Sequence, residues 1–382
     1  METTTYKISD IGEVVGGGTP STANSDFWGG DIPWISPKDL TGYKSVYISH
    51  GESFLTKTGL KSGTKLLPKG TVLFSSRAPI GYVAIASNPI CTNQGFKSII
   101  CNKEIINPLF LYYYIKGNLD YIKLFGTGAT FPEISGAAMR KIKVQIPTLP
   151  TQQKIASILS SYDRLIENNT RRIRLLEQMA ENLYKEWFVR FRFPEHEKVE
   201  MVNGLPKGWK INSLKEICEF KRGRNITSAE MCDGVIQVIS AGITPSGYHN
   251  KANVHGVSVT MSSSGANAGY ISIHYDDIWA ADCSYISEKE TEDIYYVYEL
   301  LNNIRQVINN FQIGAAQPHV YPKDINRIKT CVPPKELRIK ANANLSKIHK
   351  EIHKLYKQNQ LLTRQRDLLL PRLMSGKLEV KS

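Results

Sequence analysis

The sequence contains two similar stretches whose matching residues lie a constant 186 positions apart. "GATFPEISGAAMRKIKVQIP" occupies residues 128–147, and "GAAQPHVYPKDINRIKTCVP" occupies residues 314–333. A fixed separation of this length is typical of an internal duplication and predicts two similar domains within the 382 residues. The matched pairs are Gly128 and Gly314, Ala129 and Ala315, Pro132 and Pro318, Ile134 and Val320, Ile142 and Ile328, Lys143 and Lys329, and Pro147 and Pro333.

Two further resemblances occur in the same order in both halves. "YKISDIGEVV" at 6–15 resembles "WKINSLKEIC" at 209–218, and "SSRAPIGYVAI" at 75–85 resembles "SSSGANAGYISI" at 262–273. The first alignment matches Tyr6 with Trp209, Ile8 with Ile211 and Ile11 with Leu214. A duplicated domain is the simplest explanation, with the first half longer between its early and middle resemblances.

A long helix is predicted after each copy of the repeated stretch. Residues 151–188 contain neither Gly nor Pro, and apolar residues recur at alternating steps of four and three, which is a heptad seam. A helix of 38 residues would be about 57 Å long at 1.5 Å per residue. The seam positions of the first helix are Ile155, Leu159, Tyr162, Ile166, Asn169, Ile173, Leu176, Ala180, Leu183 and Trp187, and those of the second are Ala341, Leu345, Ile348, Ile352, Leu355, Asn359, Leu362, Arg366, Leu369 and Leu373.

Each of these helices needs a partner for its apolar stripe. Because a globular segment separates two helices of equal length, the second can return along the first as an antiparallel coiled coil. Asn169 and Asn359 would then be polar seam positions that fix the register at some cost in stability. The alternative is two independent helices, each packed on its own domain. Pro371 is expected to end or kink the second helix near Leu370.

The remaining segments predict short strands and a few helices. "TVLFSS", "GYVAIAS", "KSIIC" and "YISIHY" are rich in β-branched or aromatic residues and predict strands, while "NPLFLYYYIKGNLDYIKLF" and "EDIYYVYELLNNIRQVINNF" predict helices. The predicted fold class is α+β, with two similar globular domains of short twisted strands plus helices. Two long helices that form an antiparallel coiled coil separate the domains, and the chain as a whole has a pseudo-two-fold internal repeat. The predicted division is 1–147 and 194–333 for the domains, 148–193 for the central helix, and 334–382 for the C-terminal helix and tail.

The charge balance favours a polyanionic partner. Lys and Arg number 48 against 35 Asp and Glu, giving a formal charge of +13 and a pI near 9.3. Nucleic acid or an anionic membrane surface fits this charge, and so does a merely soluble basic protein. The sequence has no run of 18 apolar residues and no signal peptide at "METTTYKISD", so we expect a cytoplasmic protein. Six cysteines without a C-x-x-C pair indicate buried, reduced thiols.

Several loops combine small residues with basic, amide and aromatic side chains. Arg can read guanine and Asn or Gln can read adenine, while Lys and Ser commonly hold phosphates. A turn or capping role is the alternative at each position. Two such domains at the ends of a rigid spacer predict an asymmetric, interrupted DNA site. The candidate DNA-binding residues are Thr19, Ser21, Trp34, Lys38, Lys44, Arg77, Asn93, Gln94, Thr130, Lys221, Arg222, Arg224, Asn225, Ser263, Ser264, Asn267, Tyr270, Gln317 and His319.

Four stretches together resemble the specificity subunit of a type I restriction-modification system. They are "GGGTPSTANSDFWGGDIPWISPKDL", "FSSRAPIGYVAI" running into "NQGFKSI", "GTGATFPEIS", and the segment from "IPTLPTQQKIASIL" to "EWFVRF". The resemblance implies two target-recognition domains, each reading half of a bipartite site in double-stranded DNA, on two helices that act as ruler and docking surface. The sequence departs from the family pattern at "FKRGRNITSAEMCDG", where the second half lacks the "TP....W.G" opening.

The resemblance also implies the partners. They are two modification subunits, which carry S-adenosylmethionine and methylate adenine, and two restriction subunits for ATP-driven translocation and cleavage. Cofactors, including ATP and Mg, are therefore expected on the partner subunits and none in this chain. The outer helix faces, including Arg171, Arg172 and Arg174, are the expected docking surface for the modification subunits.

Enzymatic alternatives have little support in the sequence. It contains no N-P-P-Y type methylase motif and no Walker loop, so a non-catalytic recognition subunit is expected. A nuclease would rest on Glu219 and Lys221 alone. His349 and His353 could hold a metal, but no third ligand is near in sequence, so a solvated helix face is expected. The remaining alternative is a coiled-coil tether that carries two protein-binding domains.

Overall fold

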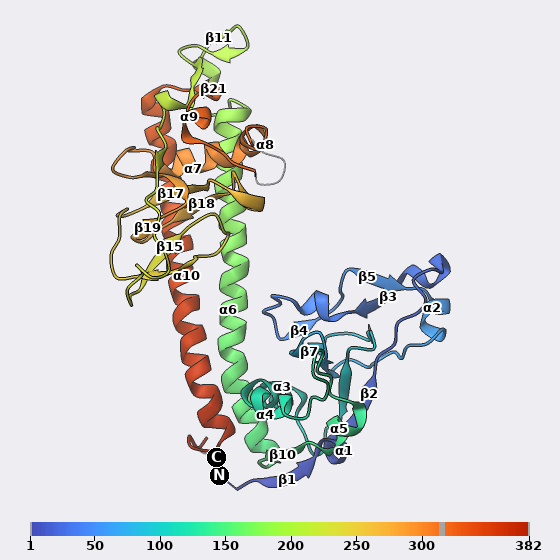
Figure 1. The fold of residues 1–382 in the computed structure, drawn as a ribbon. Coiled ribbons are helices and arrows are strands. Elements are labelled where there is room, and N and C mark those ends of the chain that lie inside the picture. The colour runs from blue at the N-terminus through green and yellow to red at the C-terminus, as the bar shows by residue number, and fades with distance from the viewer. Residues whose placement is uncertain (1, 313–317, 381–382) are drawn as a thin grey trace. The chain divides into compact units, whose positions relative to one another are not determined.

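The computed structural model describes residues 2–312 and 318–380 and divides into two compact units. Unit 1 comprises Met1–Asn169 and Gln358–Ser382, and unit 2 comprises Thr170–Lys357. Each unit contains one globular part and a segment of each of the two long helices, α6 (Leu149–Tyr184) and α10 (Lys335–Met374) (Figure 1). The predicted four-part division of the chain stays a prediction. Among the described residues, no helix is long and apolar enough to cross a membrane.

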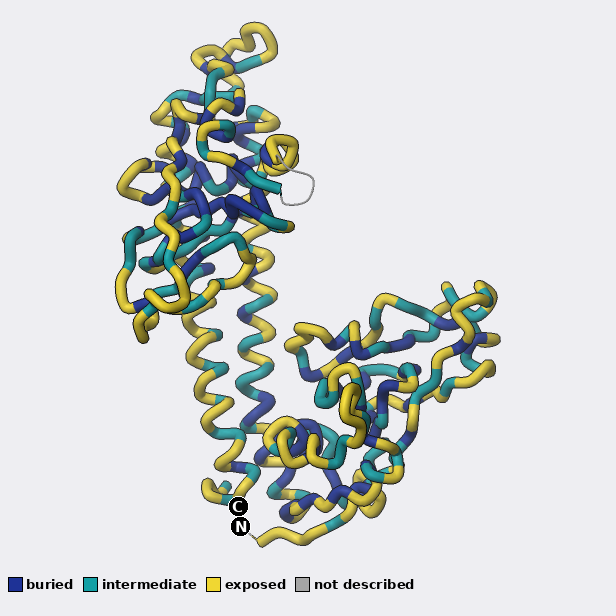
Figure 2. Tube along the Cα trace, in the orientation of Figure 1, coloured by how far each residue is buried: buried dark blue, intermediate teal, exposed yellow. Residues whose placement is uncertain are grey.

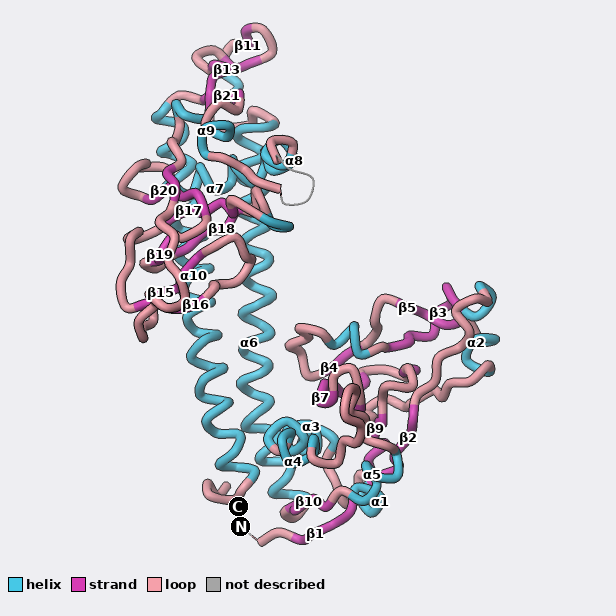
Figure 3. The backbone as a smooth tube through the Cα atoms, in the orientation of Figure 1, coloured by secondary structure: helices cyan, strands magenta, loops and turns pink. Residues whose placement is uncertain are grey.

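The globular part of unit 1 is built mostly from short strands and loops (Figure 3). Its larger sheet has the order β2-β9-β6-β7-β4, and its smaller sheet has the order β5-β3-β8. The strands are β2 (Gly12–Gly16), β3 (Trp28–Ile35), β4 (Tyr47–Ile48), β5 (Ser53–Leu55), β6 (Val72–Ser76), β7 (Ile80–Ala86), β8 (Cys91–Thr92) and β9 (Lys97–Cys101). Short helices join them, namely α1 (Ile8–Ile11), η1 (Ser25–Phe27), η2 (Pro37–Leu40) and α2 (Lys57–Lys61).

The globular part of unit 2 repeats this topology, except that its larger sheet has no counterpart of β4. Its sheets have the orders β14-β20-β17-β18 and β16-β15-β19. In the smaller sheet of each unit the middle strand, β3 or β15, is antiparallel to one neighbour and parallel to the other. The predicted duplication is therefore confirmed in three dimensions. The strands are β14 (Lys221–Arg222), β15 (Ile236–Ile239), β16 (Gly247–His249), β17 (Ser258–Ser262), β18 (Ile271–His274), β19 (Ile278–Ala280) and β20 (Cys283–Ser287).

A two-stranded ribbon closes each globular part. In unit 1, β1 (Thr4–Lys7) pairs with β10 (Lys143–Ile146), and in unit 2, β13 (Lys210–Ser213) pairs with β21 (Lys329–Val332). The first and the last of the repeated sequence stretches therefore contribute strands that pair with each other in each unit. Each ribbon delivers the chain directly to the start of a long helix.

This ribbon corrects the predicted alignment of the first resemblance. The amide of Ile8 donates to the Ile142 carbonyl at 3.0 Å, and the amide of Leu214 donates to the Ile328 carbonyl at 2.8 Å. Ile8 therefore corresponds to Leu214 rather than to Ile211, a shift of three residues. Ile211 is 58% exposed, whereas Ile8 and Leu214 are buried. The predicted alignment was wrong because both strands contain similar residue types, and only burial distinguishes the correct register.

Helices cover the sheets at the predicted places, but each predicted helix is broken once. Residues 107–125 form α3 (Pro108–Gly117) and α4 (Leu119–Lys123), and residues 292–311 form α7 (Ile294–Asn303) and α8 (Arg305–Asn309). The other elements are α5 (Gly136–Lys141), η3 (Lys185–Val189), η4 (His196–Lys198), β11 (Met201–Val202), β12 (Leu205–Pro206), η5 (Leu214–Glu216), η6 (Gly265–Asn267) and α9 (Pro322–Ile325).

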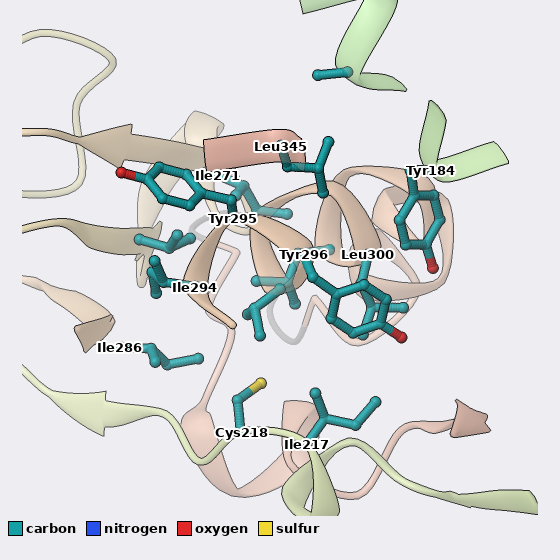
Figure 4. Close-up of a cluster of buried hydrophobic side chains, with 14 of the residues drawn as sticks. Tyr184, Ile217, Cys218, Ile271, Ile286, Ile294, Tyr295, Tyr296, Leu300 and Leu345 are labelled. Atoms are coloured by element: carbon teal, nitrogen blue, oxygen red, sulfur yellow. The ribbon is translucent and has the colours of Figure 1, made fainter. Parts of the chain in front are cut away.

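The core of each unit joins its globular part to its helix segments (Figure 2). In unit 2, Tyr184 and Leu345 from the long helices share one buried cluster with Tyr296 of α7 and Ile286 of β20 (Figure 4). Cys218 lies in the same cluster, and burial raises the pKa of its thiol. The six cysteines are free as predicted, but only Cys91, Cys218 and Cys283 are buried, whereas Cys101 and Cys331 are half-buried and Cys232 is exposed.

The long helices pair in antiparallel fashion within each unit. In unit 1, Asn169 donates to Asn359 at 3.0 Å, and Asp163 bonds Arg366, so residue numbers rise along α6 as they fall along α10. In unit 2, Arg172 pairs with Glu351 at 3.0 Å. Of the predicted seam positions, the buried ones include Ile155, Leu159, Asn169, Ile173, Leu345, Ile348, Ile352 and Leu355. Ile166, Leu176 and Leu362 are half-buried.

Pro371 does not end the second helix as predicted. Helix α10 continues to Met374, and the amide of Ser375 donates to the Pro371 carbonyl at 3.0 Å. Proline removes one backbone hydrogen bond, but here it lies in the last turn of the helix. Leu373, which is buried beyond it, holds that turn against the core of unit 1.

The Asn169–Asn359 hydrogen bond predicts a non-additive pair of substitutions. Asn169→Leu removes the buried Asn169 amide that donates to Asn359, so we expect a loss of about 1–3 kcal/mol in the free energy of unfolding. Asn169→Leu with Asn359→Leu should recover that loss, because both polar groups are removed together. Chemical unfolding of the four proteins measures the coupling, and additive effects would contradict a shared hydrogen bond.

Candidate nucleic-acid interface

Five polar side chains of unit 1 form one continuous chain of contacts. Thr19, which follows β2, donates to the Gln94 side chain after β8, and the Lys97 ammonium donates to the Gln94 backbone carbonyl at 3.2 Å. Lys97 and Arg77 then both contact Glu133, each at 3.1 Å. Elements far apart in the sequence thus place two basic groups, an amide and a hydroxyl on one surface. We call these residues patch 1.

Glu133 organises the basic end of patch 1. Burial opposes ionisation of its carboxyl group, but hydrogen bonds and charges from Lys97 and Arg77 outweigh burial and lower its pKa. One carboxylate therefore holds two cations in fixed positions while Arg77 stays 39% exposed. Thr130 and Phe131 lie on the exposed loop just before Glu133.

The "GGG" at residues 16–18 has a packing explanation. A Cβ added to Gly17 would lie 2.0 Å from the Asn93 carbonyl oxygen, and a Cβ at Gly18 would lie 1.9 Å from that of Gly63. Three chain segments therefore cross at a distance that only glycine allows. This crossing holds Thr19 beside Gln94.

Unit 2 repeats the crossing at Gly223. A Cβ there would lie 2.3 Å from the Ala281 carbonyl oxygen. The amide of Arg224 donates to Ala280 at 2.9 Å, as that of Gly18 donates to Thr92 at 2.8 Å. "FKRGRNITS" is thus the structural counterpart of "VVGGGTPST", although the sequence pattern appeared to be lost. Arg222, Arg224 and Asn225 occupy the positions of Gly16, Gly18 and Thr19.

A second polar patch surrounds this crossing in unit 2. Ser264 donates to Asp282 at 2.6 Å and lies opposite His319 in a β-bridge. The amide of Val320 donates to Ser263 at 3.0 Å, just as that of Ile134 donates to Ser76 at 3.0 Å. We call Arg222, Arg224, Asn225, Ser264, Asp282 and His319 patch 2.

The same scaffold therefore carries different chemistry in the two units. Arg77 corresponds to Ser264 and Glu133 corresponds to His319. In the first unit the arginine lies on the β6–β7 hairpin, whereas in the second the arginines lie beside the glycine crossing. Surfaces that differ in this way present different donors and charges to a ligand.

One tryptophan supports the crossing in each unit. The Trp34 indole donates to the Gly18 carbonyl at 2.9 Å, and the Trp279 indole donates to the Arg224 carbonyl at 2.8 Å. Trp34 is buried, so it packs inside unit 1 and does not lie on the surface. Trp279, Lys97, Glu133 and Asp282 were missed from the sequence because their partners come from other elements; only Glu133 lay within the repeated stretch.

The other predicted contact residues do not gather at the patches. Lys38 pairs with Glu52 at 2.9 Å, and Lys221 pairs with Glu290 at 2.8 Å. Asn93 caps the Gly95 amide at 2.9 Å. Ser21 and Lys44 are exposed on separate loops, Asn267 lies in η6, and Ser263 is buried. Gln317 lies outside the described residues.

Tyr270 lines a pocket of about 160 Å³ in unit 2, together with Gln237, Ser240 and Thr244. The Arg305 guanidinium lies 5.1 Å from the centre of its ring. His274 also lines the pocket, and burial lowers its pKa to about 4. Tyr270 is therefore half-buried and engaged rather than free on the surface.

The weak catalytic alternatives gain no support from the geometry. Glu219 pairs with Lys215 at 3.0 Å, so Glu219 and Lys221 have separate partners. The described residues contain no group of three metal-ligating side chains. The predicted solvated face for the two histidines is wrong, since His349 is buried and His353 half-buried where α10 packs on the globular part of unit 2.

Comparison with known proteins agrees with this duplicated architecture. Residues 1–178 and 206–367 match the model of a family described as "Type I restriction modification DNA specificity domain". This match covers most of the chain in two copies and places the protein in the class of DNA sequence-specificity proteins. The chain belongs to the type I restriction-modification DNA specificity family.

Individual relatives support the assignment. The chain is 35% identical over 407 aligned positions to the type I restriction enzyme MjaIX specificity subunit of Methanocaldococcus jannaschii, covering 98% of this chain and 93% of that protein. It is 30% identical over 204 positions to the EcoR124I/EcoR124II specificity subunit of Escherichia coli, covering 50% and 49%. The crystal structure of a type I S subunit from M. genitalium shares the fold, with a TM-score of 0.64 at 19% identity, covering 100% of this chain and 97% of that one.

The glycine crossing predicts opposite outcomes at neighbouring residues. Gly17→Ala should lower the free energy of unfolding by at least about 1–3 kcal/mol, because its Cβ meets the Asn93 backbone. Gly16→Ala is the matched control, since its Cβ would meet nothing within 4 Å, and we expect a change within about 0.5 kcal/mol. Equal effects in thermal unfolding would contradict the crossing.

Proposed function

We propose that this chain is the DNA-recognition subunit of a type I restriction-modification complex and that each unit reads one half of an asymmetric, bipartite site. The observation that carries the proposal is the repeated scaffold with exchanged polar groups in patches 1 and 2. An arginine can contact guanine bidentately and an amide can contact adenine, so the two surfaces favour different bases. The formal charge of +13 favours the DNA backbone in both units.

The long helices are proposed to set the distance between the half-sites and to bind two modification subunits. Exposed apolar residues on these helices support the docking role, because such patches mark protein interfaces. In unit 1 they include Leu165 (50% exposed) and Leu361 (60%), and in unit 2 they include Leu175 (59%) and Met179 (59%). Arg171 and Arg174 are exposed beside them, whereas Arg172 is engaged with Glu351.

The chemistry is proposed to reside on partners. Two modification subunits would supply S-adenosylmethionine and methylate adenine in each half-site, and two restriction subunits would use ATP and Mg. This chain then contributes recognition without catalysis and acts in the cytoplasm. Its own residues bind and orient the DNA.

The test is methylome sequencing of a strain that expresses this chain with its modification subunits. We expect one interrupted adenine-methylation motif that disappears when the gene for this chain is deleted. A tether with two protein-binding domains would leave no such motif. Active partners without any bipartite motif would overturn the proposal.

The two patches predict independent effects on the two half-sites. Arg77→Ala should relax base preference in one half-site only, and Arg224→Ala should relax it in the other, each by about 1–3 kcal/mol of discrimination. Binding to DNA libraries randomised in one half-site at a time measures this. Lys44→Ala, on an exposed loop away from patch 1, is the control, and loss of preference in both halves from one variant would contradict independent reading.

The ruler role predicts a change in spacing alone. Deleting residues 164–170 together with 358–364 removes one heptad from each helix, including both seam asparagines, and keeps the seam in phase. The helices shorten by about 10 Å, so the unspecified spacer should shorten by up to about three base pairs. Methylome sequencing of the deletion strain reads the new motif. Altered bases in either half-site would argue against the ruler.

A further inference from the structure

The globular parts of the two units dock on their long helices through the same positions but with different chemistry. In unit 1, Gln152 of α6 accepts from the Asn107 amide and donates to the Ile105 carbonyl, both at 2.9 Å. The residues 186 positions later are Arg338 and Asp293. In unit 2 these form an ion pair of 2.6 Å, with side chains only 10% and 5% exposed. A neutral amide contact in one unit is thus a buried charge pair in the other.

A second docking position shows the same exchange. In unit 1, the Tyr113 hydroxyl donates to Asp163 of α6 at 2.5 Å. The corresponding residues in unit 2 are Glu299 and His349, whose Oε1 and Nε2 atoms lie 3.3 Å apart. These side chains are 6% and 2% exposed. The carboxylate therefore lies on the helix in unit 1 and on the globular part in unit 2.

The cap of the docked helix provides a third difference. In unit 1, Asn107 caps α3 from its own chain segment by accepting from Leu109 and Phe110. In unit 2, the corresponding amides of Tyr295 and Tyr296 donate instead to Asn342 of α10, at 3.0 and 3.2 Å. The residue of α6 that corresponds to Asn342 is Ala156, which cannot accept these bonds. Asn342 of α10 therefore caps the start of α7 from the helix on which α7 docks.

We infer that these positions form a docking code that assigns each globular part to its own long helix. The code on α6 is Gln152, Ala156 and Asp163, and the code on α10 is Arg338, Asn342 and His349. Because the two globular parts share one topology, each could fit the other helix in shape. On α6, however, the unit 2 globular part would place Glu299 against Asp163 and leave Asp293 without a cation. Buried like charges and unpaired charges exclude that arrangement.

The docking code concerns contacts within each unit and does not depend on the proposed function. It has a consequence for domain exchange, since a recognition domain moved to the other position in the chain needs its helix code moved with it. The kind of surface that the unit 2 globular part accepts is a helix carrying Arg, Asn and His at steps of four and seven residues.

The first experiment writes the α10 code onto α6 in the full chain. The triple variant Gln152→Arg, Ala156→Asn and Asp163→His should accelerate hydrogen exchange of the α3 amides by at least about tenfold, because its docking contacts are lost. The matched control introduces the same three residues one position further along, as Gln153→Arg, Ser157→Asn and Arg164→His, on exposed positions of the same helix. The control should change exchange by less than about twofold.

The second experiment distinguishes a code from general damage. The recoded chain adds Asn107→Asp and Tyr113→Glu to the triple variant, which are the matching groups of unit 2. It also carries Arg366→Ala, because Arg366 contacts Asp163 and the residue that corresponds to it is Ala180. We expect this recoded chain to recover slow exchange in α3. A recoded chain no better protected than the triple variant, or a control as damaged as the triple variant, would overturn the inference.

Discussion

The pairing of the first and last strands of each globular part is the constraint on which the other features depend. β1 with β10 and β13 with β21 bring the entry and exit of each repeat together. Because the exit strand leads directly into a long helix, the globular part must dock on the first turns of that helix, where Gln152 and Arg338 lie. The repeat is thus a complete module of recognition domain plus helix. The separation is 206 residues at its entry strand and 186 residues from its exit strand into the long helix.

The module separates what must stay fixed from what can vary. Gly17 and Gly223 permit a backbone crossing that no other residue allows, and an indole donates to the carbonyl of the next residue in both units. Around this fixed crossing, Gly18 and Thr19 in one unit correspond to Arg224 and Asn225 in the other. The same division holds at the helix interface, where the positions of the contacts are constant and their charges are exchanged. A duplicated chain can therefore read two different sequences and still fold each half correctly.

Much of the architecture could be predicted from the sequence, because periodicity and repetition are local properties. The heptad seam, the Asn169 register and the presence of helices at 107–125 and 292–311 follow from residue spacing, whereas the break in each of these two helices does not. The polar patches could not be predicted as units, since Lys97 and Glu133 meet only after a sheet and a loop are formed. Ile8 was matched to Ile211 rather than Leu214 because the two strands contain similar residue types, and the sequence does not show which of these residues are buried. His349 was expected on a solvated face because a heptad pattern identifies only the residues between the two long helices. It does not identify residues such as His349 that contact the globular part.

The account is tested most directly by hydrogen exchange of the complex with and without its specific DNA. We predict new protection at the polar patch of each unit, at residues 75–79, 93–97 and 127–134 in the first and at residues 222–225, 264–267 and 280–283 in the second. Mutating one half-site of the DNA should remove protection from one unit only. Protection confined to one unit on the intact site, or absent from both patches, would contradict the claim that one scaffold reads DNA twice.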